Sequence, residues 1–266
     1  MTSARRQWSF TDVEFHVLWS DRTGGRLPFP LRFTARTRDA DRWEADVIRT
    51  RSELRERLGT SFDQVLAALI APDIRISVHG SDHRKPEEPE SLIRMMGARR
   101  GTRGYIVQTV PGENFWYSKG FTVRQCDAVR LADEMTALMP EGEMGKQAEI
   151  VLPAVGGPAG QDRPSGGPNV RDTFTLTPQQ RGAAFLAAPA SCVGAVQIEQ
   201  GTSIYGPRGI TRFRLDWRDV VDDGRYVIRD NEPPVAVPAD AKVLTTLINA
   251  KVAQVVRAIK EERQRG

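Results

Sequence analysis

The stretch APDIRISV, residues 71–78, marks a change from helical to strand periodicity, and the other elements can be ordered around it. Over residues 61–71 the apolar side chains recur at the spacing of an amphipathic helix. After Pro72, two isoleucines and a valine alternate with polar residues, as expected for a strand with one exposed face. The same junction recurs at Ala188-Pro189, where a helix ends and a strand follows over 193–199. The two junctions predict two similar halves.

Each half is expected to follow one plan, in which a capped helix leads into strands and a second helix closes the half. Thr11 with Glu14 three residues later has the pattern of a capping box, and Thr177-Pro178 has an N-cap followed by proline at the first helical position. Asp222-Asp-Gly224 has the composition of a hairpin turn. We expect strands at 91–98, 105–110, 114–118, 210–217 and 226–229, a strand followed by a helix over 43–58, and closing helices over 127–139 and 240–262.

This order of elements predicts an α+β protein with pseudo-two-fold duplicated halves, central antiparallel sheets flanked by helices, and a C-terminal helical bundle. Residues 1–266 are expected to form a single domain. Its N-terminal half would be 1–153, a Gly/Pro-rich linker would be 154–171, and its C-terminal half would be 172–266.

Composition excludes several classes of protein. The hydrophobic fraction of 39% and charged fraction of 27% are those of a globular chain, and the net charge of +4 is only mildly basic. Cys126 and Cys192 do not make a disulfide framework, which favours a reducing compartment. The first ten residues have no apolar core of a secretory signal, and no apolar run is long enough to span a membrane. We therefore expect a cytoplasmic protein with no membrane partner.

The sequence contains no pattern of a catalytic or cofactor site. The histidines are His16, His79 and His83, and none has the spacing of a metal site or of a nucleophile and its base. The glycine-rich segment 154–170 has no lysine that could complete a phosphate-binding loop. We expect no catalytic residue, no metal and no cofactor. An enzyme whose site the sequence does not reveal remains an alternative.

One segment raises a nucleic-acid alternative. Residues 94–105 are rich in arginine and end with Arg103-Gly-Tyr105, which partly matches the arginine-glycine-aromatic element of RNA-recognition sheets. Ile106 and Val107 stand where a small residue and a second aromatic residue belong. The interpretation that the sequence favours is a basic turn that leads into a strand.

Apolar surface for a partner is expected in three places. Residues 114–118 place three aromatic side chains in a row, so that at least one must point outward from a strand. Phe213, Leu215 and Trp217 fall on one side of another expected strand. The closing helix from residue 240 is apolar nearly all round in its first part, whereas a surface helix needs one stripe. That helix either packs in a bundle or leaves a patch for a partner.

The order of several short motifs over nearly the whole chain resembles the EspG family, the secretion-associated proteins of actinobacterial type VII (ESX) secretion. Each motif alone is weak, and their order is what carries the resemblance. The motifs are Thr11-x-x-Glu14-Phe15-x-x-Leu18, Leu27-Pro28-x-Pro30-Leu31, Ala71-Pro72 before a strand, Arg103-Gly-Tyr-Ile-Val-Gln108, Leu138-Met-Pro140, the Gly/Pro connection and Asp223-Gly-Arg-Tyr226.

The resemblance implies a quasi-two-fold fold and a non-enzymatic chaperone. Such a protein would bind the apolar tip of a helical PE/PPE-like substrate or another helical secreted protein, keep it soluble and direct it to export. By analogy of elements, the contacts would come from strands 210–217 and 226–229, the loop 80–90 and the helix 240–259. The residues expected to bind the partner are Asp82, Arg84, Phe213, Leu215, Trp217, Tyr226, Leu244, Leu247, Ile248 and Val252.

Overall fold

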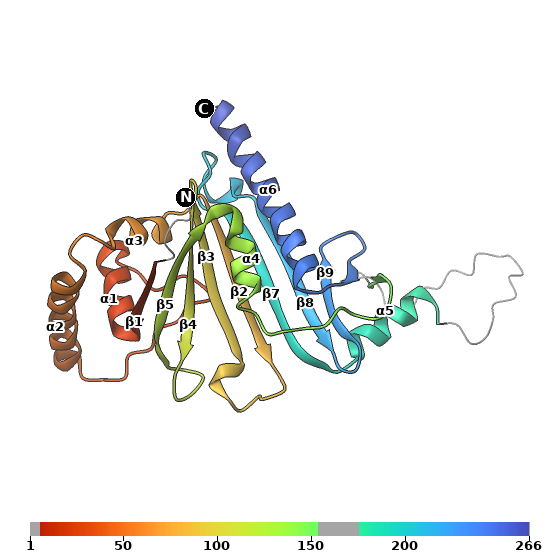
Figure 1. The fold of residues 1–266 in the computed structure, drawn as a ribbon, viewed down its shortest axis with the longest axis horizontal. Helices are drawn as coiled ribbons and strands as arrows, with labels where there is room; N and C mark the ends of the chain where they lie inside the picture. Colours follow the sequence, from red (N-terminus) through yellow and green to blue (C-terminus); the bar gives the residue numbers. More distant parts are fainter. Residues whose placement is uncertain (1–5, 154–175, 266) are drawn as a thin grey trace, which may run out of the picture.

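A computed structural model describes residues 6–153 and 176–265, and within them one ten-stranded antiparallel sheet forms the centre of the fold (Figure 1). The strands are β1 (Gln7–Thr11), β2 (Ile74–Asp82), β3 (Leu92–Arg100), β4 (Arg103–Pro111), β5 (Ser118–Asp127), β6 (Ile150–Val151), β7 (Ala190–Gln200), β8 (Arg212–Val220), β9 (Gly224–Arg229) and β10 (Val235–Pro238). The helices are α1 (Asp12–Thr23), α2 (Ala40–Leu58), α3 (Asp63–Ile70), α4 (Leu131–Thr136), α5 (Pro178–Ala187) and α6 (Ala241–Arg265), with short 3-10 turns η1 (Pro89–Ser91), η2 (Ala128–Arg130) and η3 (Pro207–Gly209).

The two strands that follow the Ala-Pro junctions pair with each other in the middle of the sheet. The strand order is β1-β5-β4-β3-β2-β7-β8-β9-β10-β6, and β2 pairs antiparallel with β7 in a register that sets Val78 opposite Val196. Outward from this pair, β3, β4 and β5 lie on one side and β8, β9 and β10 on the other, with β1 and β6 at the edges. The halves therefore share one continuous sheet.

One face of the sheet is covered by α4 and α6, which Figure 1 shows crossing the same face. The alternating apolar residues of the central strands, including Ile76 and Val196, form the largest core cluster with Leu244, Ile248 and Val255 of α6. The Thr245 hydroxyl of α6 donates a 2.9 Å hydrogen bond to the hydroxyl of Thr136 on α4. Burial of this apolar face is the main stabilising contribution, at about 25 cal/mol for each Å² removed from water.

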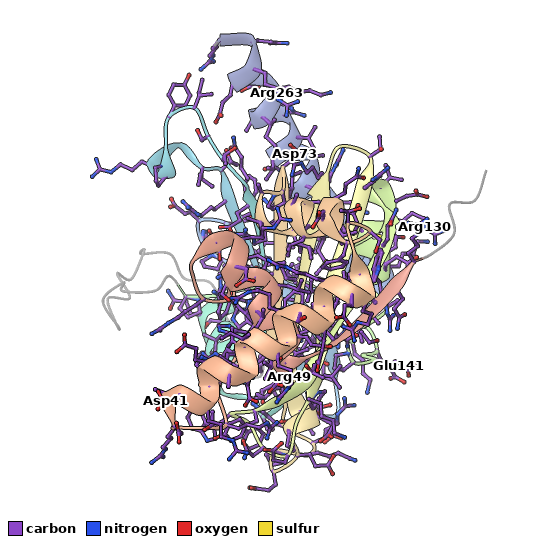
Figure 2. The ribbon with its side chains drawn as sticks, turned by 90° about the vertical axis from the view of Figure 1, so that its left-hand side faces the viewer. Asp41, Arg49, Asp73, Arg130, Glu141 and Arg263 are labelled. Carbon is purple, nitrogen blue, oxygen red and sulfur yellow. The ribbon has the colours of Figure 1, made fainter. Side chains whose placement is uncertain are left out.

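The opposite face is covered only towards its two ends. Helices α1 and α3 pack on β3, β4 and β5, and α2 packs on α1 as the outermost helix of that end (Figure 2). At the other end α5 packs beside β6 and contributes Phe185 to a small core with Tyr226.

The capping box predicted at the start of α1 is confirmed. The Thr11 hydroxyl accepts a hydrogen bond from the backbone N–H of Glu14, and the Glu14 carboxylate accepts one from the backbone N–H of Thr11.

The middle of this second face is crossed by the segment 24–39, which connects α1 to α2. The Ser77 hydroxyl of β2 donates a 3.2 Å hydrogen bond to the carbonyl of Phe29, and the Phe29 ring lies edge-on to His79 at 4.7 Å. Several of the other outward side chains on this face are charged, for example Arg75, which forms an ion pair with Glu199 of β7 at 3.3 Å. The segment leaves part of the middle strands uncovered, and the candidate site lies there.

Several expected elements are confirmed and others are corrected. Strands are present where the alternation predicted them, and the turn at Asp222 is confirmed by its positive φ of 62°. Residues 43–58 were expected to begin with a strand but belong to the single helix α2. Residues 114–118 were expected to be a strand, but 114–117 form a turn and only Ser118 belongs to a strand, β5. The Asn114 side-chain oxygen accepts hydrogen bonds from the backbone N–H groups of Trp116 and Tyr117. The expected linker 154–171 and residues 172–175 lie outside the described residues.

Candidate functional site

The structure divides the ten residues predicted to bind a partner into two groups. Leu215, Trp217, Tyr226, Leu244 and Ile248 are each at most 2% exposed, so they present almost no surface to a partner, although Trp217 is among the residues that line a hollow described below. The other five reach the surface to different degrees, and they are Asp82, Arg84, Phe213, Leu247 and Val252.

The buried group has a clear structural role, which Trp217 illustrates. Its indole lies over Gly194 and Gly80, the residues beside it on β7 and β2. A Cβ atom added at Gly194 would lie 2.2 Å from a ring carbon of Trp217. Because neither glycine has a side chain, the indole of Trp217 fits over both strands. The ring is therefore packed in the core and not exposed at the surface.

The exposed group is not brought together into one site. Phe213, Leu247 and Val252 pack partly against the main core on the face that carries α6, and the Lys251 ammonium lies 4.7 Å from the centre of the Phe213 ring. Asp82 and Arg84 lie where β2 ends and the loop 83–88 begins.

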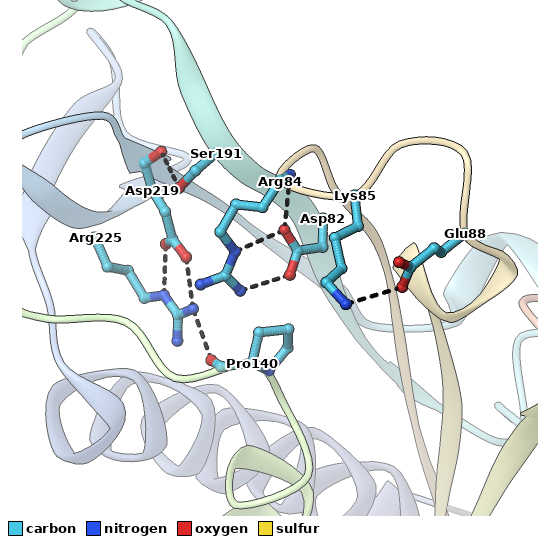
Figure 3. Close-up of polar contacts among 8 residues, drawn as sticks. All are labelled: Asp82, Arg84, Lys85, Glu88, Pro140, Ser191, Asp219 and Arg225. Atoms are coloured by element: carbon cyan, nitrogen blue, oxygen red, sulfur yellow. Dashed lines mark hydrogen bonds and ion pairs between the residues drawn. The ribbon is translucent and has the colours of Figure 1, made fainter.

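The loop after β2 is held by ion pairs within it (Figure 3). The Arg84 guanidinium donates to both carboxylate oxygens of Asp82, at 2.8 and 2.5 Å, and this hydrogen bonding lowers the pKa of Asp82. Lys85 and Glu88 form a second pair at 3.2 Å. Beside the loop, Arg225 and Asp219 form a buried ion pair.

A hollow of about 530 Å³ lies on the uncovered middle of the second face, and we call it the central groove. It combines apolar side chains with several arginines, and both halves of the chain contribute to it. Its lining includes Phe29, Pro30, Arg32, His79, Ser81, Leu92, Arg94, Val193, Arg214, Asp216, Arg218 and Ile228.

The charges of the central groove do not balance. Arg214 is neutralised by Asp216 at 2.7 Å. Neither Arg32 nor Arg94 has an ion pair within the described residues. Burial and, to a smaller extent, the charge of Arg32 lower the pKa of Arg94, and burial also lowers the pKa of His79, with Arg214 adding to the effect. The groove therefore presents positive charge beside apolar surface, which suits a partner with a carboxylate near an apolar group.

A second hollow of about 730 Å³ adjoins the central groove, and we call it the aromatic pocket. Half of its lining residues carry aromatic rings, and it shares Phe29 and Arg32 with the central groove. Within it, the His16 and Phe33 rings are stacked with their centres 4.1 Å apart. The full lining is His16, Arg26, Leu27, Phe29, Leu31, Arg32, Phe33, Thr34, Ala35, Trp43, Phe115 and Trp116.

The comparison with known proteins identifies the family. The model of the EspG family matches residues 11–250 of this chain of 266 residues. The chain belongs to the EspG family. The resemblance inferred from the order of its motifs is thereby confirmed.

Among solved structures, this EspG-family protein is similar to the Mycobacterium tuberculosis type VII secretion system chaperone EspG5 in complex with a PE25–PPE41 dimer. The TM-score is 0.52 at 14% sequence identity, and the match covers 91% of this chain and 94% of that chain. At this identity the likeness concerns the fold, a mixed α/β arrangement with a large antiparallel sheet and helices. No curated protein matches the sequence.

The arginine-rich segment of this EspG-family protein is used largely within the fold. Arg100 donates to the carbonyl of Ala67 at 2.9 Å and Arg103 to the side chain of Gln64 at 3.2 Å, so both hold α3 against the sheet. Tyr105 is 1% exposed and therefore cannot stack on a base. The arrangement does not provide the exposed aromatic platform that the RNA-binding alternative requires.

Among the described residues, no group of three or more histidine, cysteine and acidic side chains could hold a metal ion. The His83 imidazole lies 3.2 Å from the carbonyl of Ala190, away from His79, whose ring packs against Phe29. Burial raises the pKa of the Cys192 thiol. Within the same residues, no helix has the length and apolar character needed to cross a membrane.

The sequence did not predict the aromatic pocket, nor did it predict that Arg94 lines the central groove. The proline-flanked Phe29 was a visible signal, since a bulky apolar residue between prolines is often held in an extended, accessible segment. The contact of Phe29 with Ser77 and His79 of β2 was not visible, because it joins residues about fifty positions apart in the sequence.

Proposed function

We propose that this protein is a non-enzymatic, cytoplasmic chaperone that binds the apolar tip of a helical type VII secretion substrate, keeps it soluble and directs it to export. The substrate would be a PE/PPE-like pair or a similar helical protein. Membership of the EspG family supports this proposal, as does the likeness to EspG5, whose structure contains a bound PE25–PPE41 dimer. The observation that carries it is the central groove, where apolar side chains lie beside Arg32 and Arg94, two arginines that have no ion pair among the described residues.

The physical task fits such a surface. An exported helical protein with an exposed apolar tip tends to self-associate, and covering a few hundred Å² of that tip contributes about 25 cal/mol per Å². Because the substrate must later be released, a mixed apolar and polar surface is more suitable than a wholly apolar one. Arg32, Arg94 and Arg218 supply the polar part of the central groove.

The individual contacts remain part of the proposal. Asp82 and Arg84 stand at the end of β2, whose residue Ser81 lines the central groove, so the loop after β2 can form its rim. Phe213, Leu247 and Val252 offer a second, smaller apolar area beside α6. The five buried residues would act indirectly, by holding the sheet and α6 in shape.

We also infer that the fold arose by duplication, with one domain over 1–266, halves 1–153 and 172–266, and a linker at 154–171. The strand order supports this inference. From the central β2–β7 pair, each half continues with three further strands, β3, β4 and β5 in one and β8, β9 and β10 in the other, whereas the edge strands β1 and β6 both belong to residues 1–153. In each half, a helix follows the last of these inner strands, α4 in one and α6 in the other.

Affinity purification of the tagged full chain from its native cells, at low and high salt, tests the function. We expect one small helical secreted protein to be retained at both salt concentrations in about a one-to-one complex, as apolar contacts survive screening. That protein should aggregate when it is expressed without the chaperone and remain soluble with it. Recovery of nucleic acid alone, lost at high salt, would reject the chaperone and support the nucleic-acid alternative.

A further inference from the structure

The aromatic pocket leaves large rings open to solvent, which the fold does not need. Trp116 is 71% exposed and Phe29 is 48% exposed, although both line the pocket. The Phe33 ring behind them is stacked on His16 and lies 5.6 Å from Trp43. Exposed rings grouped around a hollow are typical of surfaces that receive another molecule.

The turn that carries Trp116 is ordered by specific contacts. The Asn114 side chain accepts from the backbone N–H of Trp116 at 2.9 Å. Arg36 forms an ion pair with Glu113, donates to the carbonyl of Ser118 at 3.2 Å, and lies 4.8 Å from the centre of the Tyr117 ring. Trp116 is therefore presented on a fixed turn, which reduces the entropy lost when a partner binds.

The charges around the aromatic pocket indicate the chemistry of its occupant. Arg26 and Arg32 line the pocket, and in the part of the chain that the structure describes neither has an ion-pair partner. The Nδ1 atom of His16 is buried there without a hydrogen-bond partner, and burial lowers the pKa of this imidazole. A positively charged rim selects against a cation and favours a carboxylate next to an apolar group.

We propose that the aromatic pocket binds one turn of an amphipathic helix of the chaperone's protein partner, with a carboxylate beside the inserted side chains. This inference rests on the proposed function. The volume of about 730 Å³ accommodates more than one bulky side chain, as a helix presents at positions i and i+3 or i+4. Because Phe29 and Arg32 belong to both hollows, a helix lying in the central groove can continue into the aromatic pocket.

Calorimetric titration with the purified helical partner that co-purifies with the wild-type chain tests this assignment. Trp116→Ala is expected to raise Kd by about tenfold or more, the effect of losing an aromatic anchor. Arg26→Glu is expected to raise Kd at low salt and to lose most of its effect at high salt. Tyr205→Ala and Arg130→Glu are matched controls, because both residues are exposed and lie outside the aromatic pocket, and they should leave Kd unchanged.

A second measurement follows Trp116 directly. In protein labelled with 5-fluorotryptophan, the ¹⁹F resonance that disappears in Trp116→Phe belongs to Trp116, and it should shift when the partner is added. An unchanged resonance together with unchanged affinity of Trp116→Ala would overturn the inference. If Arg94→Glu still weakens binding in that case, the chaperone function stands without this pocket.

Two further outcomes would also reject the assignment. If light scattering shows that the chain self-associates through Trp116 and the partner leaves its resonance unchanged, the pocket is an interface between copies. If the wild-type chain binds no helical partner, the proposed function and this inference fail together.

Discussion

The buried ion pair between Asp219 of β8 and Arg225 of β9 offers the sharpest test of how the end of the sheet is held together (Figure 3). The Arg225 side chain is 1% exposed, and its Nε and Nη2 atoms donate to the two Asp219 oxygens at 2.7 and 2.8 Å. Nη2 also donates to the carbonyl of Pro140 at 2.9 Å, which ties the segment after α4 to β9. A Cβ atom at Gly142 would lie 2.6 Å from the guanidinium carbon, so that segment is packed closely on it.

Asp219→Asn keeps the volume of the side chain but leaves the buried guanidinium without its counter-charge. We expect a loss of about 3–5 kcal/mol in the free energy of unfolding, because a buried charge is costly when its partner is removed. That is a large share of the roughly 5–15 kcal/mol by which domains are usually stable. The double variant Asp219→Leu with Arg225→Met removes both charges and is expected to lie much closer to the wild type.

Equilibrium unfolding in urea, followed by both fluorescence and circular dichroism, measures these differences, and coincident curves would justify a two-state treatment. Asp216→Asn is the matched control, because Asp216 also pairs with an arginine but at the surface, where such a pair contributes about 0–1 kcal/mol. A loss below about 1 kcal/mol for Asp219→Asn, or a double variant as unstable as the single one, would refute the reasoning.

Three other predictions concern the groove, the pH dependence and the first helix. Arg94→Glu should weaken partner binding by about tenfold or more at low salt while Arg130→Glu does not, as measured by calorimetry; equal effects would mean that net charge alone matters. Burial lowers the pKa of His16 and His79 in the folded state below 6.5, so their contribution to stability is present above that pH and is lost as the pH falls. The melting temperature should therefore drop from pH 7.5 to pH 5, and less so with both replaced by Gln; an equal drop would exclude these groups. Thr11→Ala removes the cap of α1 and should cost about 1 kcal/mol in urea unfolding, an expectation that a loss-free variant would contradict.

Local patterns were sufficient for the elements whose stabilising contacts are local. The capping box at Thr11 involves atoms three residues apart, and the turn at Asp222 needs only its own backbone and the following Gly224. The alternation over 74–78 predicted a strand because side chains on a strand point to opposite faces whatever it pairs with. The error at 114–118 came from overlooking a competing local contact, because the Asn114 side chain accepts hydrogen bonds from the backbone N–H groups of Trp116 and Tyr117, two and three residues along the chain.

The site depends on contacts that no local pattern contains. The first part of helix α6 is apolar nearly all round, and only its packing on the sheet determined that Leu244 and Ile248 are buried while Leu247 is partly exposed. Likewise, the alternation of Phe213, Leu215 and Trp217 on β8 did not determine whether their shared side faces solvent or the core. In the structure Leu215 and Trp217 lie on the face covered by α6, where the glycines of β2 and β7 leave room for the indole.

The sequence by itself determined the two strand junctions, the helix caps, the hairpin turn and, through the order of its motifs, the family. Only the tertiary structure determined the central groove and the aromatic pocket. Arg94 and Arg214 are brought to the groove by the registers of β2 on β3 and β7 and of β7 on β8, and Phe29 by its contacts with β2. That register is selected by burial of the alternate residues on the α6 side, and the side chains left on the other face form the groove.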